Sequence, residues 1–455
     1  MFPVVLHLEV YFESSGRHQD DDLSSVRQQI LTHLNDNFSC LQLGQQISSF
    51  DNPSLRETID YILVSGYSGP QVDSKIFYLS AVNLDINLIT LHDHTPKAFQ
   101  EPTGIPSDDT LCDPIVTQSE TSADDTPSPL RITSLPHRTL HGLYESLIFD
   151  PTVREPALPN KLLAFTTHLL HFSSTGLNPN IIHLNRVILL HGPPGTGKTS
   201  LCRALAQKLS IRLSTTFPTS TLLELHTSSL FSKFFGESVT HITNAFQTIF
   251  SLASDPSHLV LVLIDEIESI AGSRERALQT QEVGEVVRVT NALLVMLDRM
   301  RYTPNVLLLC TSNLADSMDG AFLDRVDLVE KVPLPGQGAR YDILRSCFGE
   351  MVRCGLVNGA QGDLLEGSPV PEDGMLMSLS ELRLSDETAD ESPSRRLWTL
   401  SDKCKGVSGR MLRRLPFMGL ALNAAGRSWS MKTALDCLEM AMDNMKEEET
   451  KQAEP

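Results

Sequence analysis

The sequence lacks the features that mark secreted and membrane-spanning proteins. Its eight cysteines form no Cys-x-x-Cys pair and share no metal-site spacing with histidines, which is typical of proteins from a reducing intracellular compartment. No run of about 18 apolar residues occurs, so we expect no membrane span. The first residues include no basic segment, and His7 and Glu9 interrupt their apolar run, so we expect no signal peptide.

Basic residues are also scarce. The 455 residues include 37 Lys and Arg against 56 Asp and Glu, which leaves a net charge of −19. Phosphate backbones and anionic membranes repel such a chain, so we expect no direct nucleic-acid binding and no membrane binding. Hydrophobic residues make up 41% of the chain, which is enough for packed cores. The length predicts two or three domains.

The clearest motif is Gly192–Thr199, which fills every fixed position of the phosphate-binding loop pattern G-x-x-x-x-G-K-[ST]. A short apolar strand precedes this loop, and residues 200–209 predict an amphipathic helix after it. Loop amides and the helix N-terminus would face a polyphosphate. Lys198 would reach the β- and γ-phosphates of ATP, and the Thr199 hydroxyl would ligate Mg²⁺.

The predicted nucleotide-binding residues extend over the whole loop and one upstream position. The segment 143–150 is compact and apolar, and it either lines an adenine pocket or covers a sheet edge. The predicted set is Gly192, Pro193, Pro194, Gly195, Thr196, Gly197, Lys198, Thr199, Ser200 and Ile148.

Polar residues follow two further apolar strands. The strand 259–264 ends in Asp265 and Glu266, at the carboxyl edge where parallel sheets bind ligands. Asp265 would hold Mg²⁺ through water, and Glu266 would act as the general base that polarises the attacking water. Asn313 follows the strand 306–310, and its side-chain amide would orient that water.

Two arginines come later in the chain. Arg325 would stabilise developing charge on the γ-phosphate of a neighbouring subunit, although an isolated loop arginine more often forms a surface ion pair. Arg410 opens a helix in the C-terminal region and would reach back to the γ-phosphate of its own chain, or it would simply be exposed.

An aromatic loop, Phe234-Phe235-Gly236, lies in a polar stretch between the phosphate-binding loop and Asp265. Two adjacent rings before a glycine suit a mobile loop that grips a polypeptide by shape and apolar contact. The alternative is that both rings pack in the core.

Composition divides the chain into four parts. Residues 1–98 predict a small α+β recognition domain, in which residues 4–12 alternate as a strand with one core face. Residues 99–134 are acidic and rich in Pro, Ser and Thr, which predicts a flexible linker rather than a phosphorylation-controlled tether. Residues 135–335 alternate strands and helices, which predicts an α/β domain with a parallel, helix-covered sheet. Residues 336–455 predict a small helical lid with an acidic insertion at 359–394 and a C-terminal tail.

These motifs resemble those of the AAA+ ATPases in order and spacing. The matching segments are 192–199, 233–238, 264–269, 311–313, 324–325 and 409–410. Segments outside the generic motifs are similar to the pachytene checkpoint protein 2 family, which remodels HORMA-domain proteins. These more specific segments are 185–192, 198–202, 205–213, 229–233 and 407–417.

The resemblance implies a ring, usually a hexamer, with ATP sites between subunits. Arg325 would then act on the neighbour's nucleotide and Arg410 on its own. The N-terminal domain would engage a HORMA-domain protein, often through an adaptor. The pore loops would then pull on the client's N-terminal segment and convert it from a closed to an open form. The implied location is the nucleus, on meiotic chromosomes, with the cytoplasm and kinetochores as further sites.

Three other functions remain open from the sequence. The first is an AAA+ ATPase with another client, such as a microtubule or a membrane-fusion complex, which the specific segments 205–213 and 407–417 disfavour. The second is a nucleotide-gated scaffold, which would not need Asp265, Glu266, Asn313 and Arg325 together. The third is a small-molecule or nucleoside kinase, which would explain neither the aromatic loop nor the lid arginine.

Overall fold

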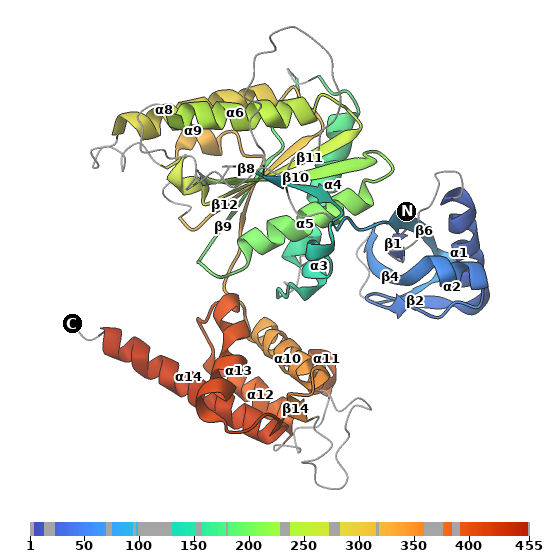
Figure 1. Ribbon diagram of the computed structural model, residues 1–455, viewed down its shortest axis with the longest axis vertical. Coiled ribbons are helices and arrows are strands. Elements are labelled where there is room, and N and C mark those ends of the chain that lie inside the picture. Colours follow the sequence, from blue (N-terminus) through green and yellow to red (C-terminus); the bar gives the residue numbers. More distant parts are fainter. Residues whose placement is uncertain are drawn as a thin grey trace, which may run out of the picture.

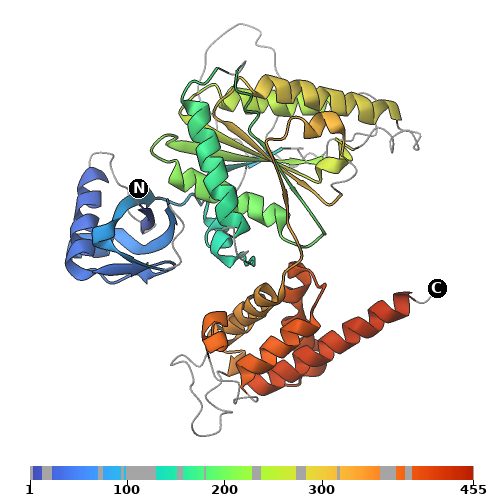
Figure 2. The same ribbon diagram turned by 180° about the vertical axis from the view of Figure 1, so that it is seen from behind.

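The chain forms an N-terminal domain, a large domain built on a central sheet, and a helical lid (Figures 1 and 2). The computed structural model describes residues 4–12, 23–69, 75–93, 97–98, 130–150, 157–178, 181–227, 237–272, 283–314, 318–358, 376–384 and 392–453. The N-terminal domain lies beside α5 and α3 of the large domain, and the lid lies beyond the end of the sheet (Figure 1).

The N-terminal domain packs helices against a four-stranded sheet of order β3-β4-β1-β6. Its elements are β1 (Val4–Phe12), α1 (Leu23–Asn37), β2 (Cys40–Gln42), β3 (Gln46–Ile47), α2 (Pro53–Thr58), β4 (Ile59–Ser68), β5 (Ile76–Tyr78) and β6 (Val82–Ile89). Strand β1 runs antiparallel to β4 and parallel to β6. Alternate residues Leu6, Leu8 and Val10 enter a core with Ile30 and Leu34 of α1, as the apolar periodicity predicts.

The opposite face of β1 is buried too. Glu9 and Tyr11 are only 1% and 5% exposed, although the alternation predicts a strand with a single core face. That prediction is wrong because this polar face packs against the large domain instead of meeting water. Tyr11 and Ile89 form a small apolar cluster with Ile211 of α5.

The large domain is organised around a seven-stranded sheet of order β13-β9-β12-β11-β10-β8-β7. Its elements are β7 (Lys97–Ala98), β8 (Leu130–Leu135), α3 (Leu143–Ser146), α4 (Leu158–Ser174), β9 (Val187–His191), α5 (Lys198–Arg212), β10 (Thr219–His226), α6 (Glu237–Leu252), β11 (His258–Asp265), α8 (Val283–Met300), β12 (Val306–Ser312), α9 (Gly320–Leu323) and β13 (Leu328–Lys331). The strands from β13 to β10 are parallel, so the predicted AAA+ α/β fold is confirmed.

Two antiparallel strands extend this sheet. Strand β8 pairs with β10, and β7 pairs with β8. Since β8 begins at Leu130, it lies across the expected boundary at residue 134 between the linker and the large domain.

Helices cover both faces of the large sheet (Figure 1). Val187 and Leu189 of β9 point into the core beneath α6 and α8, whereas Ile188 and Leu190 point into the core beneath α4 and α5. The predicted amphipathic helix is α5, but it is buried around most of its circumference. The sheet covers one side of α5, and α3 together with the N-terminal domain covers much of the other.

The lid is a helical cluster joined to the large domain after β13 (Figures 1 and 2). Its elements are α10 (Gln337–Arg353), β14 (Val357–Asn358), α11 (Leu379–Leu384), α12 (Pro393–Lys403), α13 (Gly409–Asn423), β15 (Trp429–Ser430) and α14 (Met431–Ala453). Tyr341 and Phe348 are fully buried at its centre. No helix in the described ranges combines the length and the apolar character that crossing a membrane requires.

Candidate nucleotide site

The phosphate-binding loop connects β9 to α5 and requires glycine at specific positions. Gly192 has φ +148°, and a Cβ there would lie 2.3 Å from the backbone oxygen of Val332. Gly195 has φ +76°, and a Cβ there would lie 2.8 Å from Ser408 Oγ in the lid. Glycine therefore serves the backbone turn and the close approach of two neighbouring segments.

Lys198 lies at the first position of α5 with its ammonium held inside the loop. Nζ donates to the backbone oxygens of Gly192 and Pro193 at 2.9 and 2.8 Å, and to Asn313 Oδ1 at 2.8 Å. These three partners are all neutral, so no carboxylate compensates the positive charge by direct hydrogen bonding within the described part of the chain. Burial lowers the pKa of Lys198, and the more distant Glu268 and Asp265 oppose that shift.

Thr199 and Asp265 meet at the carboxyl edge of the sheet. Thr199 Oγ1 donates to Asp265 Oδ1 and Oδ2 at 2.9 and 3.1 Å, and the Thr311 hydroxyl also donates to Oδ1. The structure therefore brings together the two predicted magnesium ligands. Within the described ranges no group of three or more His, Cys, Asp or Glu side chains could hold a metal ion by itself.

Glu266 turns out of β11 in a backbone conformation that non-glycine residues rarely adopt, with φ 54° and ψ 48°. Its amide donates to Thr311 Oγ1 at 3.3 Å. Strain of this kind persists where the surrounding structure holds a residue in place. The turn places Glu266 on the wall of a cavity of about 140 Å³ that Lys198, Asp265, Asn313 and the phosphate loop also line.

Two further residues shape this edge although no role was predicted for them. The Thr311 hydroxyl bridges the Asp265 carboxylate and the Glu266 backbone amide. Glu268 Oε1 accepts from the backbone amide of Asn313 at 3.0 Å. Glu268 Oε2 is buried and has no hydrogen-bond partner within the described part of the chain. Both residues lie inside motif segments, 264–269 and 311–313, and their nearness in sequence to Asp265 and Asn313 is the signal that could have found them.

Arg410 lines the same cavity from the lid. The Ser408 hydroxyl accepts from the Met411 amide at 3.4 Å and so caps helix α13. The Arg410 amide donates to the backbone oxygen of Gly195 at 3.0 Å. The lid therefore contacts the phosphate loop directly, and Arg410 is positioned at the predicted site.

A second cavity of about 260 Å³ adjoins the phosphate loop. Ile148, Leu158 and Ile343 supply apolar walls, and Thr196 of the loop and Gly409 of the lid close it. Ile148 also packs against the lid core, so the segment 143–150 contacts the lid as well as this cavity. Lys161, Glu330 and Lys331 line it as well. A cavity with apolar walls and a few polar groups next to a phosphate loop has the character that a nucleobase requires.

The last residue of that segment holds the lid in place. Asp150 accepts from the Gly336 and Ala339 amides at 2.5 and 2.8 Å, at the N-terminus of α10. Free amides at a helix start favour an acidic partner, and here the partner comes from a segment 186 residues away. Sequence reasoning missed this contact because the two segments share no local pattern.

The Arg325 side chain does not reach either of these cavities within its own subunit. Nε and Nη2 donate to the two carboxylate oxygens of Asp298 in α8 at 2.8 and 2.9 Å, and Nη1 donates to the Ala321 oxygen at 2.7 Å. Arg325 is absent from the described linings of both cavities. The aromatic loop residues Phe234, Phe235 and Gly236 lie outside the described residues.

Three family models together match most of the chain. The TRIP13 N-terminal domain model matches residues 2–94, the model of the ATPase family associated with various cellular activities matches 188–334, and the TRIP13-like AAA+ ATPase lid C-terminal domain model matches 336–446. A pachytene checkpoint protein 2 homolog from Danio rerio is 33% identical over 446 residues, covering 98% of this chain and 94% of the relative.

This chain belongs to the pachytene checkpoint protein 2 family. The homolog from Arabidopsis thaliana is 42% identical over 300 residues, covering 66% of this chain and 63% of the relative. The structure of C. elegans PCH-2 has a TM-score of 0.73 to this chain at 26% identity, covering 97% of this chain and 99% of that one. The resemblance drawn from the motifs is therefore confirmed.

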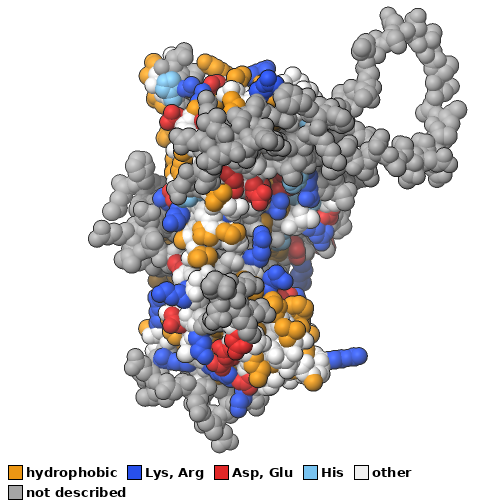
Figure 3. All heavy atoms as spheres, turned by 90° about the vertical axis from the view of Figure 1, so that its left-hand side faces the viewer, with side chains coloured by type: hydrophobic (Ala, Val, Ile, Leu, Met, Phe, Trp, Pro, Cys, Tyr) orange, Lys and Arg blue, Asp and Glu red, His pale blue; other side chains and the backbone are white. Residues whose placement is uncertain are grey.

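The large domain and the lid therefore form an AAA ATPase module with a nucleotide site. Members of the AAA family commonly assemble into oligomers. Among the described residues on the face shown in Figure 3, basic, acidic and hydrophobic side chains are interspersed rather than gathered into one basic field.

Proposed function

We propose that this chain is an ATP-hydrolysing, ring-forming protein remodeller that converts HORMA-domain proteins from a closed to an open form. The observation that carries the proposal is the convergence of Lys198, Asp265, Glu266, Asn313 and Arg410 on one cavity. Membership of the pachytene checkpoint protein 2 family over the N-terminal domain, the ATPase domain and the lid supports the client class.

The phosphate loop and α5 would bind the nucleotide. Loop amides would face the polyphosphate, Lys198 would exchange its neutral partners for phosphate oxygens, and Ile148 would contact the base. Thr199 and Asp265 fit a magnesium ion, because they offer only hard oxygen donors and leave further positions to phosphates and water. When bound, magnesium neutralises charge on the phosphate oxygens.

Hydrolysis requires an activated water beside the γ-phosphate. The Glu266 carboxylate would accept a proton from that water, and the Asn313 amide would fix its orientation. Both side chains line the cavity, and Glu268 holds the Asn313 backbone at 3.0 Å. Glu266 and Asn313 therefore supply proton transfer and positioning.

Two arginines would act on the transferred phosphoryl group from different directions. Arg410 lines its own chain's cavity, which supports a role in cis. Arg325 is paired with Asp298 and does not line that cavity, so it would act on the nucleotide of a neighbouring subunit in a hexameric ring. This division would make hydrolysis depend on assembly.

The client would be engaged in two steps. The N-terminal domain would bind a HORMA-domain protein, with an adaptor where one is needed, and Phe234, Phe235 and Gly236 would grip its N-terminal segment. The family's name suggests a meiotic role, which gives the nucleus and meiotic chromosomes as the proposed location, with the cytoplasm and kinetochores as further sites.

A client-conversion assay tests this function. The full chain is incubated with a closed HORMA-domain protein and either ATP or a non-hydrolysable ATP analogue, and the closed and open forms are separated by ion-exchange chromatography. We expect conversion with ATP alone and none with the analogue. Active ATP hydrolysis without conversion, for every HORMA client tested with and without an adaptor, would contradict the assigned client class.

A further inference from the structure

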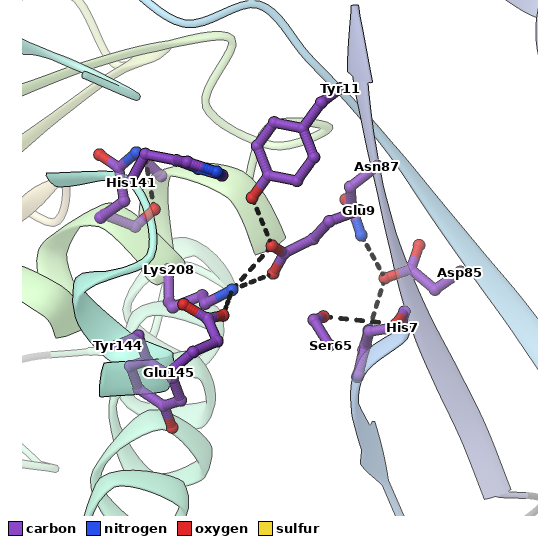
Figure 4. A network of polar contacts seen from close by, with 12 residues as sticks. His7, Glu9, Tyr11, Ser65, Asp85, Asn87, His141, Tyr144, Glu145 and Lys208 are labelled. Atoms are coloured by element: carbon purple, nitrogen blue, oxygen red, sulfur yellow. Dashed lines mark hydrogen bonds and ion pairs between the residues drawn. The ribbon is translucent and has the colours of Figure 1, made fainter. Parts of the chain in front are cut away.

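One buried ammonium joins the N-terminal domain to the nucleotide-binding domain (Figure 4). Lys208 Nζ donates to Glu9 Oε1 and Oε2 at 2.6 and 2.7 Å and to Glu145 Oε1 at 2.6 Å. The Lys208 and Glu9 side chains are 4% and 1% exposed, whereas Glu145 is 40% exposed. Glu9 comes from β1, Lys208 from α5 and Glu145 from α3. These three residues are called the docking cluster below.

Aromatic contacts surround the docking cluster. The Tyr11 hydroxyl donates to Glu9 Oε2 at 2.7 Å, and the Tyr11 ring stacks on Tyr61 with centroids 4.7 Å apart. Tyr61 Oη and His141 Nε2 lie 2.6 Å apart, which joins the N-terminal domain to the segment just before α3. Figure 4 shows Tyr11, Glu9 and Lys208 directed toward one another between the two domains.

Both large-domain elements in the docking cluster also carry nucleotide-site residues. Helix α5 begins with Lys198 in the phosphate loop and bears Lys208 near its other end. Helix α3 bears Glu145, and Ile148 follows shortly after it to line the second cavity. One continuous helix of 15 residues therefore connects Lys208 to Lys198.

The chemistry of this interface suits a reversible contact. Its buried groups include the charged Glu9 and Lys208, and the apolar cluster beside them is small. Separation of the domains would restore water to Lys208 and Glu9, which offsets much of the lost attraction. A polar interface between domains therefore permits docking and release, in contrast to the apolar cores on either side of it.

We propose that the docking cluster couples the position of the N-terminal domain to nucleotide binding, so that docking strengthens nucleotide affinity and bound nucleotide strengthens docking. Such coupling is reciprocal, because each event changes the other's equilibrium by the same factor. The inference rests on the proposed function only in requiring that nucleotide binds beside Lys198. Lys208 acts here as a positioning residue, since it does not contact the nucleotide site itself.

Two variants release the contact by different means. Lys208→Met removes the ammonium and keeps an unbranched side chain. Gly66→Leu places a bulky side chain between the domains, where a Cβ would already lie 2.8 Å from Arg212 Nη2 at the end of α5. Arg353→Met is the matched control, since it removes a cation from an exposed ion pair with Glu350 in the lid.

The test measures nucleotide affinity and domain docking on the full chain. A titration with a non-hydrolysable ATP analogue and magnesium gives the affinity. Amide hydrogen exchange in β1 and in the last turn of α5, with and without the analogue, gives the docking. Thermal melts identify any variant that fails to fold, and if Lys208→Met does so, Gly66→Leu decides the question.

We expect the folded variants to bind the analogue about five- to tenfold more weakly and to lose the analogue-dependent protection of β1, with Arg353→Met unchanged. Loss of docking at unchanged affinity would overturn the coupling, and so would protection that persists in both variants. A parent chain that binds no analogue would overturn the proposed function and this coupling together.

Discussion

Two lysines on helix α5 have similar burial but opposite surroundings. Lys198 is 6% exposed and Lys208 is 3% exposed. Lys198 donates to two backbone oxygens and to Asn313, all of them neutral, whereas Lys208 donates to the carboxylates of Glu9 and Glu145. The first charge is uncompensated by its immediate partners, and the second is compensated.

The difference separates a binding charge from a structural one. A buried cation with neutral partners is attractive to an anion, so Lys198 is ready to receive phosphate oxygens. A buried cation between carboxylates gains little from a further anion, so Lys208 fastens the elements that hold the site. Burial alone would not distinguish the two lysines, but their partners do.

Removing the uncompensated charge has the largest expected effect. Lys198→Ala should abolish measurable nucleotide binding, a loss of about 100-fold or more, because the polyphosphate loses its buried charge-assisted contact. Isothermal titration with ATP and magnesium measures the affinity. Lys208→Met is the comparison, and its expected loss is about five- to tenfold. Equal losses in the two variants would remove the distinction between them.

Arg325 challenges the comparison, because it is a compensated cation with a proposed catalytic role. If it acts across a subunit interface, Arg325→Ala should lower turnover by about 10³- to 10⁵-fold. Mixing Arg325→Ala chains with Glu266→Gln chains should restore part of the ATPase rate, since some interfaces then pair an intact base with an intact arginine. Co-assembled mixtures that stay inactive at every ratio would argue for a role confined to the Asp298 pair.

The phosphate site could be predicted from sequence because its residues occur in short patterns next to apolar strands. Gly192–Thr199 is contiguous, and Asp265, Glu266 and Asn313 follow strands whose order in the sheet brings their ends together. The docking cluster could not be predicted from the sequence, since Glu9 and Lys208 are 199 residues apart and share no local pattern. The polar face of β1 is equally compatible with contact to water and with contact to another polar surface, so the sequence pattern does not distinguish the two.

The aromatic loop tests whether gripping of the client is separate from the buried charges that bind nucleotide. Phe234→Ala with Phe235→Ala should leave nucleotide binding at the parent level and stop conversion of a HORMA client, because the apolar grip on the client is lost. Client-conversion and ATP-titration assays on the same preparation measure both properties. A destabilised variant would favour two core rings, and a stable variant with full conversion would exclude the grip.

Asp150 is the anionic counterpart of Lys198, because its carboxylate accepts hydrogen bonds from neutral backbone amides. Asp150→Ala should lower the stability of the lid by about 1–2 kcal/mol, because the Gly336 and Ala339 amides lose their acceptor. Chemical denaturation followed by Trp398 and Trp429 fluorescence reports on the lid. Glu350→Ala is the control, since that carboxylate is 60% exposed and its partner Arg353 is 71% exposed, so its loss should change stability by less than about 0.5 kcal/mol.

The most direct measurement of the central claim is ATP occupancy and turnover in Glu266→Gln. The account assigns phosphate binding to Lys198 and water activation to Glu266, so this variant should bind ATP as tightly as the parent chain. Its steady-state hydrolysis should fall by about 10²- to 10⁴-fold. Turnover at the parent rate with ATP bound would contradict the assignment of Glu266 as the general base at this site.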